Sequence, residues 1–325
     1  MALVIRLAVT IVLLVLAAPH AGDAQPPRTV VIGVLSGGTQ AGYSGRFEAF
    51  RQALRESGHV DTRHVRFEER WADGRLERLP ELAAELVRLK VDVIVAPGTP
   101  AALAAKRATR EIPIVFPSAG DPVGNKLVES LARPGGNVTG LSIMTELGPK
   151  RLELMRQALP NVNRIALLTN HSNPGNPPQT KLMQDAAHAL KVDFRVFDVH
   201  RPDDLDAAFI EMAKQRVGAL IITAEGTWLG QQTRLSSLAL KYRLPTMVSS
   251  DWVQAGFLMT FAIDIKAQYR RAAMYVARIL QGARPADLPV EQPTKFRFVV
   301  NLRTAKALGV TIPPAVLLQA DEVIQ

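Results

Sequence analysis

Hydroxyl, amide and carboxylate side chains, together with a few glycines, follow short apolar runs along the chain. In an open α/β sheet, ligands bind beyond the carboxyl ends of the strands, where loops and helix N-termini offer N–H donors. Residues of these types bind a small polar solute through hydrogen bonds and ion pairs. The candidate ligand-binding residues are Ser36, Gly37, Tyr43, Gly98, Thr99, Ser118, Asp121, Asn170, Glu225, Thr227 and Asp251.

Several of these positions allow two interpretations. Gly98 and Thr99 open an Ala-rich helix whose N–H groups suit an anion, but a plain helix start flanked by proline has the same pattern. Asp121 suits either a ligand ammonium or the N-cap of a following helix, and Ser44 suits the N-cap of the first helix. The indoles of Trp228 and Trp252 suit either stacking on a ligand or filling an interdomain surface.

Motifs of the common catalytic and cofactor sites are absent from the sequence. It has no GxSxG elbow, no GxxxxGK[ST] loop and no HExxH pair, and its loop at Ser36–Thr39 lacks the GxGxxG spacing. The chain has no cysteine, and its histidines lack metal-ligand spacing. We therefore expect a binding protein that needs no cofactor and no metal. An exported enzyme with Asp121 or Glu225 as its base is the alternative from another class.

The elements that must position these residues alternate between strand and helix. Short β-rich runs are separated by stretches with apolar residues at spacings of three and four, which predicts an α/β fold with parallel, doubly wound sheets. The predicted strands are 30–35, 64–70, 92–96, 112–116, 138–143, 164–169, 193–199, 219–223, 246–248, 257–261 and 296–300. A C-terminal helix is predicted after Pro313-Pro314.

The two sets of strands predict two lobes joined by a hinge, with a cleft between them. A length of 325 residues suits two domains. The first lobe is predicted to cover 28–143 and to be joined by a returning helix at 265–282, and the second to cover 144–262 and to be joined by part of 290–325. The stripe on the returning helix consists of Ile265, Tyr269, Ala272, Ala273, Val276 and Ile279.

The N-terminus has the features of an export signal. A short positive segment ending at Arg6 precedes the apolar run Leu7–Ala18, and Gly22-Asp23-Ala24 offers small residues for cleavage. We predict a signal peptide at residues 1–24. A lipobox needs a cysteine and the chain has none, so we do not expect a lipoprotein. We expect the mature chain to be a soluble periplasmic protein, most simply a monomer.

The net charge of +9 does not indicate a nucleic-acid partner. A nucleic-acid-binding surface needs clustered Lys and Arg with interleaved aromatic residues, whereas the basic residues here are scattered and only 6% of the residues are aromatic. We expect a solvated, mildly basic surface.

Four stretches of the sequence resemble a known family. Residues 74–106, 112–140, 150–155 (KRLELM) and 286–314 are similar to the ABC transporter substrate-binding family that includes the tryptophan-binding TrpX-type proteins. The similarity runs from about Thr29 to the C-terminus. The loops after the third and fourth strands (APGTP and PSAGDP) and the later loop SSDWVQAG differ from the more usual family pattern.

The resemblance implies a type 1 periplasmic-binding fold with two Rossmann-like lobes, a three-segment hinge and a ligand held in the closing cleft. It implies an amino acid or related solute as ligand and a membrane permease, driven by a cytoplasmic ATPase, as partner. The loops of Ser36, Thr99, Asp121, Asn170 and Glu225 match the family's cleft-facing loops. A sensory role as the extracellular input of a receptor is the alternative to transport.

Overall fold

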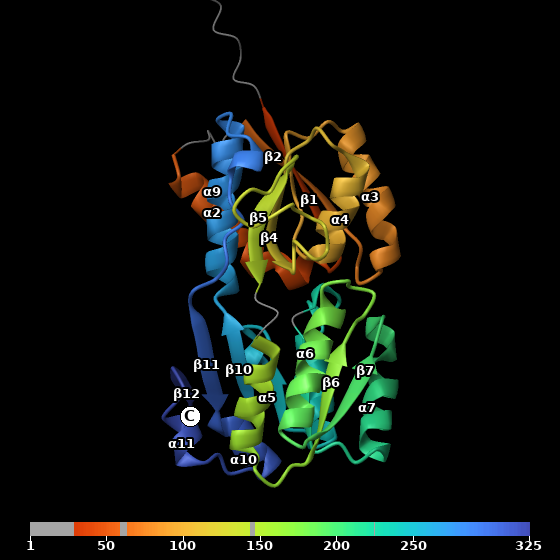
Figure 1. Ribbon diagram of the computed structural model, residues 1–325, viewed down its shortest axis with the longest axis vertical. Coiled ribbons are helices and arrows are strands. Elements are labelled where there is room, and N and C mark those ends of the chain that lie inside the picture. Colours follow the sequence, from red (N-terminus) through yellow and green to blue (C-terminus); the bar gives the residue numbers. More distant parts are fainter. Residues whose placement is uncertain (1–28, 59–63, 144–146, 224) are drawn as a thin grey trace, which may run out of the picture.

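The chain folds into two α/β lobes stacked along the long axis of the molecule (Figure 1). This computed structural model describes residues 29–58, 64–143, 147–223 and 225–325. The predicted signal peptide at 1–24 lies outside the described residues. Within them, no helix has the length and apolar character needed to cross a membrane.

The first lobe is built on a five-stranded sheet with the order β2-β1-β3-β4-β5, and every neighbouring pair is parallel. Its strands are β1 (Val30–Ser36), β2 (Val65–Trp71), β3 (Val93–Val95), β4 (Ile114–Gly120) and β5 (Val138–Ile143). The fourth strand begins two residues later and ends four residues later than the predicted run 112–116. The strand therefore carries the backbone of Ser118 toward the second lobe.

Helices cover both faces of this sheet, which explains its nearly continuous apolar strands. Helices α3 (Leu79–Arg88) and α4 (Thr99–Ala108) pack with Ile94 and Phe116 on one face. Helices α2 (Gln40–Glu56) and α9 (Ile265–Leu280) pack with Val93 and Val95 on the other. The six residues of the predicted stripe on α9 are all buried, which confirms that prediction.

The second lobe is built on a seven-stranded sheet with the order β12-β11-β10-β9-β8-β6-β7. Its strands are β6 (Arg164–Thr169), β7 (Asp193–Asp198), β8 (Ala219–Ile222), β9 (Thr246–Val248), β10 (Met259–Ile263), β11 (Phe296–Asn301) and β12 (Glu322–Ile324). Its main helices are α5 (Leu147–Ala158), α6 (Asn176–Ala189), α7 (Leu205–Lys214) and α8 (Gln232–Lys241). The short helices α10 (Leu302–Leu308) and α11 (Pro314–Leu317) lie near the C-terminus, and the short strand β12 after them was not predicted.

The prediction of purely parallel sheets is wrong at one pair of strands, because β10 and β11 are antiparallel. Strand β10 runs toward the first lobe and leads into α9, whereas β11 enters the second lobe after α9 has ended (Figure 1). Because β10 runs toward the first lobe and the neighbouring β11 runs away from it, these two strands pair antiparallel.

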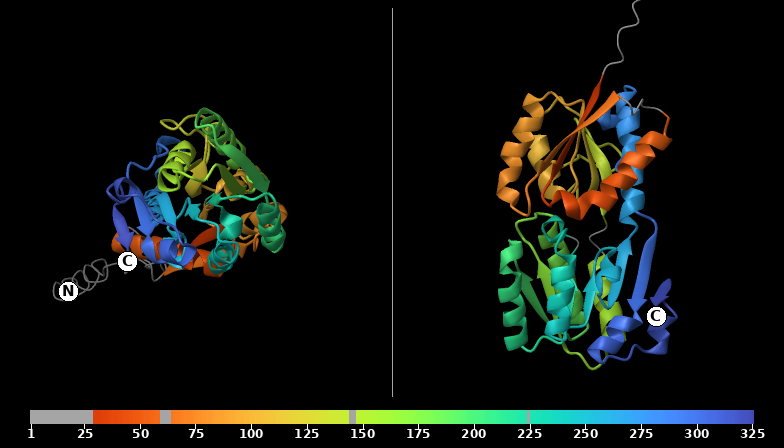
Figure 2. Two further views of the ribbon diagram at one scale, coloured as in Figure 1. Left: turned by 90° about the horizontal axis from the view of Figure 1, so that it is seen from below. Right: turned by 180° about the vertical axis from the view of Figure 1, so that it is seen from behind.

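The chain passes between the lobes at three places in this arrangement: between β5 and α5, between β10 and α9, and between α9 and β11 (Figures 1 and 2). Helix α9 belongs by its contacts to the first lobe, where it packs along α2 and against β4. The carboxyl ends of the parallel strands of both lobes thus face one another across the junction.

Candidate ligand-binding site

A cavity lies at the junction and is lined by loops from both lobes. The first lobe contributes the loops after β1 and β3 and the end of β4, and the second contributes the loops after β6, β8 and β9. Apolar side chains next to the crossings between the lobes close one end. These are Ile143, Leu147, Ile263 and Ile265.

The start of helix α4 forms part of the wall on the side of the first lobe. Gly98, the residue before the helix, has φ +86°, a conformation that favours glycine, and its N–H donates to the carbonyl of Ser118 over 2.7 Å. The Thr99 hydroxyl accepts from the N–H of Gly120 at 3.0 Å and lies 3.2 Å from its carbonyl oxygen. This hydroxyl therefore joins two loops, and the first backbone N–H groups of the helix are left as donors at the cavity.

Glu225 is the buried carboxylate of the opposite wall, with a relative exposure of 4%. Its Oε2 accepts hydrogen bonds from Nδ2 of Asn173 and Nδ2 of Asn176, both over 2.8 Å, and its Oε1 accepts from Thr227. Burial raises the pKa of Glu225 above the usual range, and the two asparagine amides oppose the rise. The amide donors hold this carboxylate in place without a cation.

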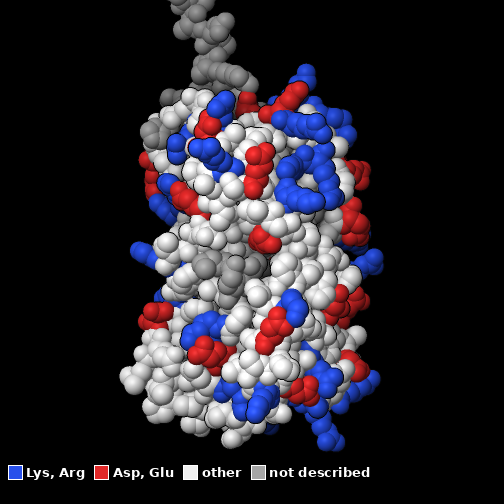
Figure 3. All heavy atoms as spheres, in the orientation of Figure 1, with Lys and Arg blue, Asp and Glu red and all other residues white. Residues whose placement is uncertain are grey.

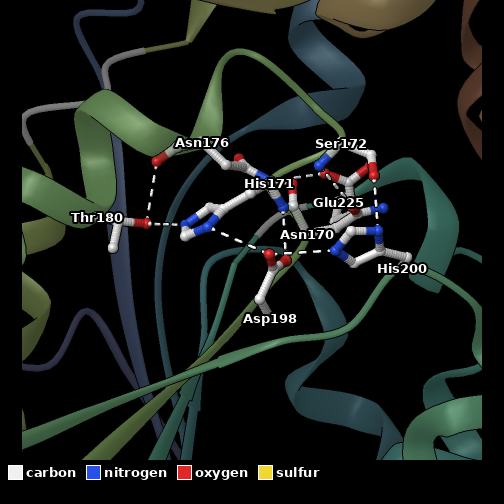
Figure 4. A network of polar contacts seen from close by, with 8 residues as sticks. All are labelled: Asn170, His171, Ser172, Asn176, Thr180, Asp198, His200 and Glu225. Carbon is white, nitrogen blue, oxygen red and sulfur yellow. Dashed lines mark hydrogen bonds and ion pairs between the residues drawn. The ribbon is translucent and has the colours of Figure 1, made fainter.

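A polar network behind Glu225 fixes the loop that carries the two asparagines (Figure 4). The Asp198 carboxylate lies 3.4 Å from Nδ1 of His171 and 3.1 Å from Nε2 of His200. His171 also contacts Thr180 over 3.0 Å, and Thr180 bonds the carbonyl of Asn176 over 3.1 Å. The start of helix α6, which supplies Asn176, is therefore tied to the end of strand β7.

Arg46 connects the two lobes. From helix α2, its Nη2 donates to Oγ of Ser250 in the second lobe over 3.0 Å and lies 3.6 Å from a carboxylate oxygen of Asp251. Its guanidinium also lies over the ring of Tyr43, 5.6 Å from the centroid. The lobes are thus in contact, as in a closed cleft.

Arg151 was not predicted as a site residue, yet it lines the cavity from helix α5 with a relative exposure of 4%. Its Nε donates to the carbonyl of Phe261 over 2.8 Å. Burial lowers the pKa of Arg151 to about 9, so the guanidinium is still protonated at neutral pH. The sequence does hold a signal for it, because Arg151 occupies the same helical stripe as the buried Leu147, Met155 and Ala158.

The structure brings six of the predicted residues to the cavity wall and places the other five behind it. Gly37, Tyr43, Gly98, Thr99, Ser118 and Glu225 line the cavity, whereas Ser36, Asp121, Asn170, Thr227 and Asp251 do not. Behind the wall, Ser36 accepts a hydrogen bond from the N–H of Gly38, Asn170 donates to Thr227, and Asp251 faces Arg46.

Two predicted caps are wrong. The Asp121 carboxylate accepts a hydrogen bond from the N–H of Gly124 over 2.8 Å, and the backbone of Asp121 has φ +40°. The residues after Asp121 form a series of turns rather than a helix. The first helix is capped by Thr39, whose Oγ1 accepts from the N–H of Gly42, and Ser44 lies inside that helix. Of the two indoles, Trp252 lines the cavity and Trp228 is fully buried in the core.

Comparison with known proteins gives consistent results. The chain is 27% identical over 264 residues to the tyrosine-binding protein of Clostridioides difficile (strain R20291), an alignment that covers 80% of this chain and 75% of that relative. It is similar to two solved structures at 27% identity, each covering 91% of this chain and 100% of the other. One is a conserved domain protein from Vibrio cholerae with a TM-score of 0.85, and the other is an ABC domain from Streptococcus pneumoniae in complex with L-Trp with a TM-score of 0.83.

The family model described as ABC transporter substrate binding protein matches residues 34–324. This match includes every residue named at the cavity and both sheets, apart from the first four residues of β1. The chain belongs to the ABC transporter substrate-binding protein family.

Proposed function

We propose that the chain is the solute-binding component of an ABC-type uptake transporter and binds a small polar solute, an amino acid or a related compound, between its lobes. The observation that carries this proposal is a cavity with walls from both lobes that holds a buried carboxylate, Glu225, on one side. Members of the family bind and deliver solutes and are not catalysts.

An amino acid matches the chemistry of the walls. Its ammonium would pair with the carboxylate of Glu225. This carboxylate is negatively charged, and its hydrogen bonds from Asn173 and Asn176 come from neutral amides that leave the charge uncompensated. The N–H groups at the start of helix α4 are further donors at the same cavity, available to polar groups of the solute. The side chain would lie among the apolar residues Leu76, Leu229 and Trp252. Relatives with a bound tryptophan or a tyrosine-binding name support this class of ligand.

Closure of the two lobes would trap the solute. The cross-lobe contacts include the bond from Arg46 to Ser250 and a contact of 3.4 Å from Oγ1 of Thr39 to the carbonyl oxygen of Leu229. A solute that contacts both walls binds the closed form more tightly than the open form, and so shifts the population toward closure.

The family implies a small-molecule ligand and a membrane permease as partner, and its members act outside the cytoplasm. We propose, more specifically, a monomeric periplasmic protein exported by residues 1–24 and not anchored by lipid, since the sequence lacks a cysteine. Lys and Arg are interspersed with Asp and Glu on the face shown in Figure 3, which supports the expectation that nucleic acid is not a partner.

Isothermal titration of the purified chain against the common amino acids and their deaminated acids tests this proposal. We expect at least one amino acid to bind with one-to-one stoichiometry and its deaminated analogue to bind about 100-fold more weakly, because Glu225 would lack its cation. Binding that is indifferent to the ammonium, or the absence of binding by every amino acid, would contradict the proposed ligand class.

A further inference from the structure

Two polar atoms in the second-lobe wall of the cavity are buried and have no hydrogen-bond partner among the described residues. They are Nη1 of Arg151 and Oγ of Ser249. Both residues line the cavity, and their relative exposures are 4% and 7%. Since an unpaired buried polar group is costly, two of them in one wall indicate a missing partner in the cavity.

Strand register places these two residues at the same edge of the second sheet. Strands β9 and β10 pair in parallel, with Met247 beside Met259 and Val248 beside Thr260. Ser249 directly follows Val248, the last residue of β9, and Phe261 directly follows its partner Thr260 in β10. Because Arg151 donates its Nε hydrogen to the Phe261 carbonyl, the guanidinium is fixed next to the strand end that carries Ser249.

The charges of the cavity wall are also unbalanced at this point. Its charged residues among those described are Arg46, Arg151 and Glu225. Arg46 faces Asp251, and Glu225 is satisfied by amide and hydroxyl donors. Only the cation of Arg151 faces the cavity without an acidic neighbour among these residues, and its pKa of about 9 keeps it charged at neutral pH.

A carboxylate has the charge and the acceptors that this pair requires. A guanidinium carries five N–H donors in a planar fork that matches the two oxygens of a carboxylate, and a serine hydroxyl adds one further donor. A neutral carbonyl or amide would satisfy the hydrogen bonds but not the charge.

We propose that Arg151 and Ser249 together bind a carboxylate of the solute, and that the protein therefore selects carboxylated solutes over their neutral analogues. This inference rests on the proposed function and names the group that the second lobe recognises. It assigns to helix α5, which begins just after the chain leaves the first lobe, a direct part in solute selection.

Titration with matched pairs of solutes tests the inference. L-tyrosine and L-tryptophan are compared with L-tyrosinamide and L-tryptophanamide, which keep the ammonium and the ring but lack the negative charge. We expect the unmodified chain to bind at least one acid on the order of 100-fold more tightly than its amide. Arg151→Met is expected to weaken acid binding by about 100-fold and amide binding by less than about 3-fold, and Ser249→Ala to weaken acid binding alone by about 10-fold.

The control is Lys150→Met, one residue away on the same helix, whose partly exposed ammonium contacts Glu153 at 3.1 Å. We expect it to leave both affinities unchanged. The ligand-free melting temperature of Arg151→Met is expected to equal or exceed that of the unmodified chain, because an unpaired buried cation is removed. Arg151→Lys, which keeps the charge without the fork, is expected to recover only part of the affinity.

Equal weakening of acid and amide in Arg151→Met would overturn the inference, because the residue would then act only on the shape of the site. If neither acid binds the unmodified chain, the comparison is made with the amino acid that titration identifies and its amide. If no amino acid binds, the proposed ligand class fails, and acetate becomes the probe of the inference. Acetate substituted for chloride at constant ionic strength should raise the melting temperature of the unmodified chain by more than that of Arg151→Met. Identical responses of the two chains would overturn it.

Discussion

Nη2 of Arg46, on helix α2 of the first lobe, donates a hydrogen bond over 3.0 Å to Oγ of Ser250, which follows strand β9 of the second. The two residues are 204 positions apart in sequence, and the bond exists only when the lobes are together. Closure is therefore linked to named contacts whose removal should weaken solute binding without unfolding either lobe.

Arg46→Met should raise the Kd for the solute by about 10-fold, because a cross-lobe hydrogen bond and a nearby ion pair are lost from the closed form only. Arg55→Met on the same helix is the control, since the exposed Arg55 pairs at 3.0 Å with Glu48 of its own helix. Titration calorimetry measures both variants. Equal affinities for the two would show that the Arg46 contact does not stabilise closure.

Gly42 provides a steric test of closure. A Cβ atom at this position would lie 2.5 Å from the carbonyl carbon of Leu229 and 2.7 Å from the backbone nitrogen of Gly230, both in the other lobe. Gly42→Ala should therefore weaken solute binding by more than 10-fold while stabilising helix α2 by up to about 1 kcal/mol.

The matched control is Gly45→Ala, one turn further along α2, where a Cβ atom meets nothing within 4 Å. It should give the same gain in helix stability and leave affinity unchanged. Thermal unfolding and titration separate the two effects. Normal affinity in Gly42→Ala would mean that solute binds without bringing α2 and Leu229 together.

Recognition of the ammonium depends on Glu225. Glu225→Gln keeps the shape and the acceptor for one asparagine amide but removes the charge, so the Kd for the amino acid should rise by about 100-fold. The Kd for the deaminated analogue should change little or fall. Titration of both solutes gives the comparison, and parallel losses for the two would assign Glu225 a purely structural part.

The stability of the ligand-free chain should carry a pH dependence from the same residue. Burial raises the pKa of Glu225 above its ordinary value of 4.5, so the folded chain binds more protons at this site than the unfolded chain does. The contribution of Glu225 to the free energy of unfolding therefore falls as pH rises from about 4.5 through the raised pKa.

Denaturant titration over this pH range measures the free energies of unfolding of the unmodified chain and of Glu225→Gln. The difference between the two isolates that contribution. Glu211→Gln, measured from neutral pH to below about pH 4.5, is the control of opposite sign, because Gln215 and Lys214 lower the pKa of the exposed Glu211 below its ordinary value of 4.5. Its stabilising contribution is present at neutral pH and is lost as pH falls through the lowered pKa. A Glu225 difference that rises with pH would contradict the assigned direction.

The fold was largely predictable because apolar runs and helical stripes are local patterns. The limits of strands β5, β6 and β9 match the predicted ranges, α9 begins at the predicted residue and ends two residues early, and the general fold class is confirmed. The direction of β11 cannot be predicted from its own residues, because it depends on the predicted return of the preceding helix to the first lobe together with the place of β11 in the second sheet. The strand is antiparallel only because α9 packs in the first lobe.

The site was predictable as a set of loops but less well as side chains. Glu225 and the Gly98-Thr99 turn follow strands and do reach the cavity, whereas Asp121 bonds its own turn. A loop position does not specify whether a side chain points to a ligand or to its own backbone. Arg151 lies within a helix rather than in a loop at a strand end, so the loop pattern does not predict it.

A distance measurement between the lobes tests the central claim, closure around a solute, most directly. The chain has no cysteine, so Glu77→Cys and Asp203→Cys place unique spin labels at exposed positions near the place where the backbone of Gly74 approaches Pro202 of the second lobe. Double electron–electron resonance should give a distance distribution that shortens and narrows when a solute identified by titration is added. A distribution that is the same with and without saturating solute would contradict the account.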